Sequence, residues 1–127
     1  MTPVKRVSSN ILALFDRFGL VLTLALMVLI TAASLLPKES AAGPGAVDKP
    51  MHVIAYAVAV LPAAVVPSGP VLWLAAWVVA WGGAIELLQP LVGRSMKLSD
   101  MAANAVGVLV GLLVAFLVQR LLNRMSE

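Results

Sequence analysis

Three stretches of this sequence contain no Asp, Glu, Lys or Arg, and they limit the possible folds more than any other feature. They cover residues 18–37, 50–85 and 101–119. Charge-free stretches of this length are typical of membrane spans, because a helix needs ~17–25 residues to cross the hydrocarbon core. The middle stretch is too long for one span, and the Pro-Ser-Gly-Pro sequence at residues 67–70 divides it at a strong turn signal.

We therefore predict an all-α fold, an integral membrane bundle of four transmembrane helices in a single domain covering residues 1–127. The predicted spans are residues 19–36, 50–66, 70–88 and 101–122. Ahead of the first span, apolar side chains recur at helical spacing; they are Ile11, Leu12, Leu14, Phe15 and Phe18. This pattern predicts a short interfacial N-terminal helix that lies on the membrane surface and leads into the first span.

Composition excludes several other classes of protein. The chain is 61% hydrophobic with a mean hydropathy of +1.01, so it has few ionisable groups. The net charge is +3, but the basic residues occur in ones and twos at the ends of the predicted spans, which favours membrane anchoring over nucleic-acid binding. The absence of cysteine excludes disulfides, thiol nucleophiles and thiolate metal sites.

The positions of Lys and Arg predict the orientation of the helices. Five of these residues fall on the side of the two termini and four on the opposite side. Since the more basic side of a membrane protein is usually cytoplasmic, we predict that both termini are in the cytoplasm. Trp73, Trp77 and Trp81 are four residues apart on the third span, and we interpret them as a face toward lipid.

Against this apolar background, polar side chains form two clusters. Asp48, Lys49, His52 and Tyr56 lie at the start of the second span. Glu86, Gln89, Arg94, Asp100 and Asn104 lie around the end of the third span and the start of the fourth. The predicted topology puts both clusters on the outer side of the membrane. Polar groups within or at the rim of membrane helices are costly, and by default they mark a functional site.

Helical spacing predicts that the clusters converge. His52 and Tyr56 are four residues apart, as are Asp100 and Asn104, and each pair shares one helix face. Small residues form two further stripes, Ala55, Ala59 and Ala63 on the second span and Ala103, Gly107, Gly111 and Ala115 on the fourth. Such stripes allow close contact between helices, which would bring the polar rims together.

The order and spacing of these motifs resemble the VanZ-like family of small bacterial multi-pass membrane proteins. The resemblance covers Asp48-Lys49-x-x-His52-x-x-x-Tyr56, Glu86-x-x-Gln89, Gly93-Arg94-Ser95 and Asp100-x-x-x-Asn104-x-x-Gly107-x-x-x-Gly111. Pro50, directly after Asp-Lys, departs from the expected pattern but is tolerated in a first helical turn. The resemblance implies a cell-envelope protein of the bacterial cytoplasmic (inner) membrane, with a link to glycopeptide (teicoplanin-type) resistance. It implies no known reaction.

Three functions stay open at this point. In the first, the polar pocket at the outer membrane rim binds an anionic envelope lipid or a lipid-linked precursor, with Arg94, Lys49 and His52 supplying positive charge. The second is a membrane-embedded hydrolase or transferase, in which His52 is a general base oriented by Asp48 or Glu86. In the third, the polar residues form an internal network of a non-catalytic membrane scaffold or assembly subunit.

Each polar residue also has a structural interpretation. Asp48 and Asp100 suit the first turn of a helix, where acidic groups are favoured. Lys49 and Arg94 suit the headgroup region. Gln89 and Asn104 suit hydrogen bonds between helices. Glu86 is hardest to explain in this way, because a carboxylate in a membrane helix costs ~2.5–3.5 kcal/mol at the helix centre; we expect it to pair with Lys49, Arg94 or His52.

The sequence predicts membrane lipids or a lipid-linked envelope precursor as partners, and no nucleic acid. We also consider a homo-oligomer or a membrane-protein partner that contacts the stripe formed by Ala103, Gly107 and Gly111. We predict no resident cofactor or metal, although a Mg²⁺ site built from Glu86, Asp100 and Asn104 stays open. A metal site with two histidines is excluded, because His52 is the only histidine.

Overall fold

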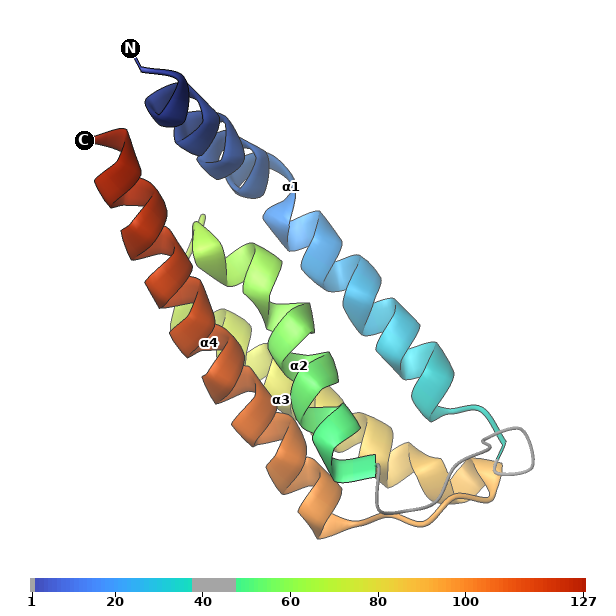
Figure 1. The fold of residues 1–127 in the computed structure, drawn as a ribbon. Coiled ribbons are helices and arrows are strands. Elements are labelled where there is room, and N and C mark those ends of the chain that lie inside the picture. Colours follow the sequence, from blue (N-terminus) through green and yellow to red (C-terminus); the bar gives the residue numbers. More distant parts are fainter. Residues whose placement is uncertain (1, 38–47) are drawn as a thin grey trace.

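The computed structural model describes residues 2–37 and 48–127, and all regular secondary structure in these residues is helical. The α-helices are α1 (Pro3–Ser34), α2 (Asp48–Val65), α3 (Val71–Leu88) and α4 (Leu98–Ser126), and the 3₁₀ helix η2 (Gln89–Val92) follows α3. The α-helices run alternately up and down along the bundle (Figure 1). The prediction of an all-α fold is confirmed.

Three helices are long and apolar enough to cross a membrane. They are α1, α4, and α3 together with η2. The apolar part of α2, Lys49–Val65, is shorter. Its apolar length, and not a break in the helix, separates it from the other three. The predicted spans lie within these helices except for a few residues at their ends.

The N-terminal segment differs from the prediction. It is not a separate short helix, because α1 is one continuous helix of 32 residues. Thr2 caps the start of α1 by accepting a hydrogen bond from the Lys5 backbone N–H, and Pro3 occupies the favoured first position. Nothing between Pro3 and Gly19 breaks the helix. At 1.5 Å per residue α1 is about 48 Å long, which exceeds the ~30 Å hydrocarbon core.

Helices α2 and α4 form the most extensive contact of the bundle. A Cβ atom at Gly107 would lie 2.5 Å from the Val53 carbonyl oxygen, and one at Gly111 would lie 2.6 Å from that of Ala57. Only glycine permits this approach, because the obstacle is backbone of the facing helix. The small-residue stripe of α4 is therefore filled by α2 of the same chain, and a second copy or another partner would need a different face.

The stripe of α2 is used differently. Ala63 packs against α1, where Gly19 lies directly against the Pro62 carbonyl group. At the same place the buried Thr23 hydroxyl accepts a hydrogen bond of 3.1 Å from the Ala63 backbone N–H. The two predicted stripes thus do not face each other, because Gly107 and Gly111 of α4 meet Val53 and Ala57 while Ala63 of α2 meets α1. Instead α2 is held between α1 and α4.

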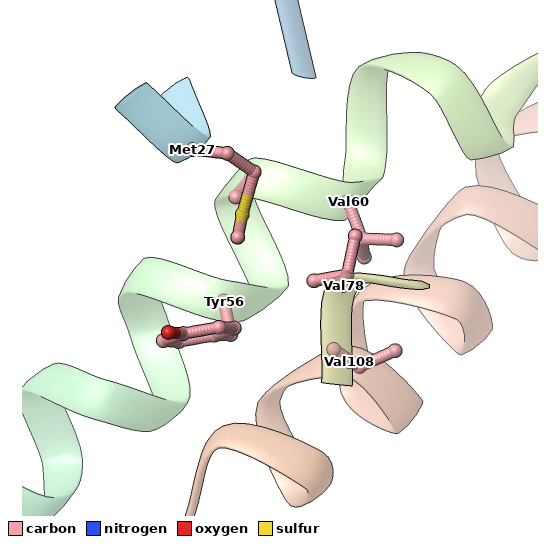
Figure 2. Packing of buried hydrophobic residues seen from close by; sticks show 6 residues of the cluster. Met27, Tyr56, Val60, Val78 and Val108 are labelled. Atoms are coloured by element: carbon pink, nitrogen blue, oxygen red, sulfur yellow. The ribbon is translucent and has the colours of Figure 1, made fainter. Parts of the chain in front are cut away.

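The main hydrophobic core lies where all four α-helices meet. Figure 2 shows Met27 of α1, Tyr56 and Val60 of α2, Val78 of α3 and Val108 of α4 in one cluster. All five side chains are buried. A second apolar cluster, which includes Val65 and Leu122, lies toward the chain termini. The core is thus continuous along α2 and α4.

The tryptophans of helix α3 lie on the outside of the bundle. The Trp73 side chain is 76% exposed, and Trp77 and Trp81 stack with their ring centroids 5.8 Å apart. This exposure is what a lipid-facing surface requires. Trp81 also ties α3 to α1, because its indole N–H donates a hydrogen bond of 2.9 Å to the Thr31 hydroxyl.

We predict that Gly107→Ala lowers the free energy of unfolding by about 1–3 kcal/mol, because the added methyl group meets backbone that cannot rotate away. Gly83→Ala is the matched control, since its Cβ meets nothing within 4 Å. Alanine is the better helix former, so this control keeps or slightly raises stability. Unfolding in detergent with increasing SDS, followed by circular dichroism, measures both. Equal stabilities of the two variants would contradict the tight contact.

Candidate functional site

The candidate site lies at the end of the bundle opposite the chain termini. The N- and C-termini lie together at one end (Figure 1), where the Lys5 ammonium group donates a hydrogen bond to the Glu127 backbone oxygen. At the other end α2 and α4 begin and α3 ends. His52 is in the second turn of α2, Glu86 in the last turn of α3, and Asp100 in the first turn of α4. The helix ends therefore bring these side chains to one level.

His52 is at the centre of the site. Its Nδ1 atom lies 2.7 Å from Oδ1 of Asn104 and 3.9 Å from Oε1 of Glu86. Its Nε2 atom lies 3.9 Å from Oδ2 of Asp100. The imidazole ring thus faces a carboxylate with each of its nitrogens, and its side chain is 17% exposed. Four of the residues singled out in the sequence come together here.

The contact with Asn104 sets the proton arrangement of the imidazole. The amide oxygen of Asn104 is an acceptor only, so His52 Nδ1 must be the donor. This holds for both the neutral and the charged ring. In the neutral form the Nε2 atom then carries the lone pair, and this atom faces Asp100.

Glu86 is the most unusual residue of the site. It is completely buried, and neither carboxylate oxygen has a hydrogen-bond partner of normal geometry among the described residues. His52 is its strongest source of electrostatic attraction, followed by the Lys97 backbone N–H and the Arg94 guanidinium. Asp100, also buried, repels it. Because buried charges are normally paired or bound to a metal, this carboxylate has far less compensation than usual.

The amide nitrogen of Asn104 is the other buried side-chain atom of the site without a hydrogen-bond partner. Asp100 has a hydrogen-bond partner, because the Ser99 hydroxyl donates to its Oδ1 atom at 3.5 Å. The unsatisfied atoms therefore belong to Glu86 and Asn104, which both face His52. Buried polar atoms without partners are rare in folded proteins and require a specific explanation.

Tyr56 and Gln89 lie next to this cluster and support it. The Tyr56 ring fills the space beside Gly82, one turn before Glu86, and its Cβ lies against Gly107. The buried Gln89 side chain points toward α1, where its amide nitrogen is 3.5 Å from the Ser34 backbone oxygen. Gln89 thus ties η2 to α1.

The basic residues occupy the rim. Lys49 is exposed in the first turn of α2. Arg94 follows Gly93, whose φ of 75° ends η2, and its backbone N–H donates to the Gln89 carbonyl at 3.0 Å. The Arg94 side chain is half-buried and forms no ion pair within the described part of the chain. The side chain of Asp48 lies outside the described part of the structure, so its place in the site stays a prediction.

An apolar cavity opens beside His52, and the sequence reasoning did not identify it. It has a volume of about 150 Å³, lies between the end of α1 and the start of α2, and is lined by Ile30, Ala33, Ser34, Met51, His52, Ala55 and Tyr56. Ile30, Ala33 and Ser34 share one face of α1 by their helical spacing, but so do other sets of residues on this apolar helix. Apolar residues of a membrane helix give no indication of which face lines a cavity, so only the packing of α1 on α2 identifies them.

No family model matches the chain, and no curated protein or solved structure was found to be similar to it.

The chemistry of the site follows from its groups. His52, Glu86 and Asp100 are residue types that transfer protons and ligate cations. Among the described residues, no hydroxyl group is hydrogen-bonded to His52, so no activated nucleophile is in place. Asn104, and not a carboxylate, makes the short hydrogen bond that orients the ring.

We predict that His52→Ala lowers the free energy of unfolding by about 3–5 kcal/mol, because it removes the nearest partner of a buried carboxylate, an imidazole that is positive when protonated. Adding Glu86→Gln removes that carboxylate charge. We therefore expect the double variant to lose about 0.5–3 kcal/mol less unfolding free energy than the two single variants lose together.

Asp16→Asn is the control for this cycle. Asp16 is an exposed acid of α1, and its removal in the His52→Ala background should be additive. Unfolding free energies of all the variants in the same detergent measure the coupling. If the effects of His52→Ala and Glu86→Gln on the unfolding free energy were also additive, an electrostatic interaction between the two residues would be contradicted.

Proposed function

We propose that this chain is a VanZ-like membrane protein of the bacterial cell envelope whose polar rim binds an anionic envelope lipid or lipid-linked precursor. In this proposal all four α-helices span the cytoplasmic membrane, with both termini in the cytoplasm and the site at the outer surface. The link to glycopeptide resistance rests on the motif resemblance alone.

The arrangement of α2 supports its role as a fourth span. It has 18 residues, which is within the length that can cross the hydrocarbon core. It is packed between α1 and α4 along the bundle, with Val60 and Ala59 completely buried. A helix enclosed by two apolar helices follows them through the bilayer.

The observation that carries the proposal is the meeting of an apolar cavity with a polar cluster. The cavity between α1 and α2 has apolar walls formed by residues such as Ile30 and Met51, and His52 lies at its edge. His52 is also the centre of the polar cluster. A ligand with an apolar chain and a polar head matches both surfaces at once.

The anionic character of the ligand follows from Arg94 and Lys49. The Arg94 guanidinium has a planar fork of donors that suits a phosphate or carboxylate, and it lacks an ion-pair partner among the described residues. Lys49 is exposed at the same rim. Glu86 and Asp100 have the opposite charge, so they orient the site and do not contact the phosphate.

The topology is tested with reporter fusions that distinguish the cytoplasm from the outside. A reporter after Glu127 should give the cytoplasmic signal. A reporter within residues 41–46, which lie outside the described part of the structure, should give the external signal, because one span separates that segment from the N-terminus. Identical signals at the two positions would mean that the number of spans is not four.

We predict that Arg94→Ala weakens binding of phosphatidylglycerol about 10-fold or more, since hydrogen bonds to charged groups contribute ~1.5–3 kcal/mol. Arg94→Lys should recover only part of the loss, because an ammonium group lacks the two-pronged geometry. Native mass spectrometry of the detergent-solubilised protein measures lipid retention, with phosphatidylcholine as the comparison lipid. Arg124→Ala, at the opposite end of the bundle, is the matched control and should bind like the wild type.

Thermal melts of the same variants distinguish binding from a purely structural role. If Arg94 serves only to neutralise Glu86, Arg94→Ala lowers the melting temperature strongly and Glu86→Gln restores it. A headgroup-binding Arg94 is at the rim, so its loss leaves the melting temperature nearly unchanged. A large drop repaired by Glu86→Gln, together with unchanged lipid retention, would refute the proposed function in favour of a scaffold.

A further inference from the structure

Three potential metal ligands converge in the polar cluster from three different helices. His52 of α2, Glu86 of α3 and Asp100 of α4 each place one ligand atom within 4.8 Å of the others. Three ligand atoms bound to one Zn²⁺ ion at about 2.1 Å lie about 3.4–3.6 Å apart. Side-chain rotations must therefore bring these atoms about 1 Å closer together before they can share one ion.

The two acidic groups of the cluster favour a bound cation. Glu86 and Asp100 are both buried, at 0% and 5% exposure, and a single imidazole lies between them. One proton on His52 supplies one positive charge for two carboxylates. Neither Glu86 oxygen has a hydrogen-bond partner of normal geometry among the described residues, so this carboxylate has a coordination position to offer. A divalent cation balances both charges and fills that position.

Asn104 orients His52 as a metal-binding histidine is usually oriented. The hydrogen bond of 2.7 Å places the proton on Nδ1 and leaves the lone pair on Nε2. Nε2 is the nitrogen that faces Asp100, whereas the Glu86 carboxylate lies 3.9 Å from Nδ1, so Glu86 has to rotate toward Nε2 to share the ion. Histidines that bind metals almost always donate their other N–H to such an outer partner, which fixes the tautomer and the ring plane. The half-buried ring also borders the apolar cavity.

We propose that His52, Glu86 and Asp100 form a binding site for one divalent transition-metal ion, with Asn104 as the outer partner that orients His52. An imidazole with two carboxylates suits Zn²⁺ or Mn²⁺ better than Mg²⁺ or Ca²⁺, which prefer oxygen ligands alone. Three protein ligands leave at least one coordination position open. The site goes beyond the proposed headgroup binding and does not depend on it, because all its ligands come from the chain itself.

The test measures metal binding to the full-length protein in detergent without added lipid. The metal-stripped protein is titrated with Zn²⁺ and, separately, with Mn²⁺ by isothermal calorimetry, and bound metal is then counted by mass spectrometry after desalting. We expect about one ion per chain, a higher melting temperature in its presence, and weaker binding of Mg²⁺ and Ca²⁺. Because no lipid is present, the result is independent of whether a headgroup binds.

Variants test the ligand assignment. Glu86→Gln and Asp100→Asn keep the side-chain shape but remove a charged ligand, and each should abolish binding of one ion per chain. Asn104→Leu should weaken binding about 10–100-fold, as expected for loss of an outer partner. Asp16→Asn, which removes an exposed acid on α1, is the matched control and should bind as tightly as the wild type.

Two results would overturn the proposal. The first is a folded wild-type protein, judged by its helical circular dichroism, that binds neither Zn²⁺ nor Mn²⁺ with defined stoichiometry. The second is binding that persists unchanged in Glu86→Gln and Asp100→Asn, which would assign the metal to other surface groups. The first result needs no variant, so the proposal is testable even if a substitution prevents folding.

Discussion

The rest of the structure depends on the close approach of α2 and α4. Gly107 lies against the Val53 carbonyl group, and no larger residue fits in this position. His52 precedes Val53 in the chain, and Asn104 is one turn before Gly107. The glycine contact therefore sets the register in which the imidazole meets the amide oxygen at 2.7 Å. A shift of one residue along either helix would separate them.

A second glycine contact brings in the third helix. The Tyr56 ring lies beside Gly82, and Glu86 is one turn further along α3. Tyr56 is itself one turn after His52 on α2. The aromatic ring thus acts as a spacer that holds α3 at the height where the Glu86 carboxylate faces His52 at 3.9 Å. Packing of small residues against one aromatic side chain creates the polar site above it.

Burial of the polar cluster costs free energy that the packing of the helices alone does not offset. Two buried carboxylates and the Asn104 amide oxygen share one imidazole, while both Glu86 oxygens and the Asn104 amide nitrogen lack a hydrogen-bond partner of normal geometry in the described chain. A scaffold that only needed to hold its helices together would be more stable with apolar residues in these positions. The retention of uncompensated polarity at one end of an apolar bundle is the strongest physical indication that this end binds something.

The sequence by itself determined the all-helical fold, the approximate helix positions and the side of the bundle on which the polar residues gather. The lengths of the charge-free stretches and the positions of the turn residues predict these features, because each depends only on residues close together in the sequence. It missed the continuity of α1, since interfacial and spanning segments share the same helical periodicity and no residue between them breaks the helix.

Only the tertiary structure decided which polar residues meet. Gln89 has the same spacing signal as its neighbours, yet it turns to the Ser34 backbone, while Asn104 becomes the partner of His52. The rotation of each helix about its own axis determines this choice. That rotation follows from contacts between helices, such as Gly107 with Val53 and Gly82 with Tyr56. Such contacts join residues far apart in the chain, so the pattern within any one helix does not contain them.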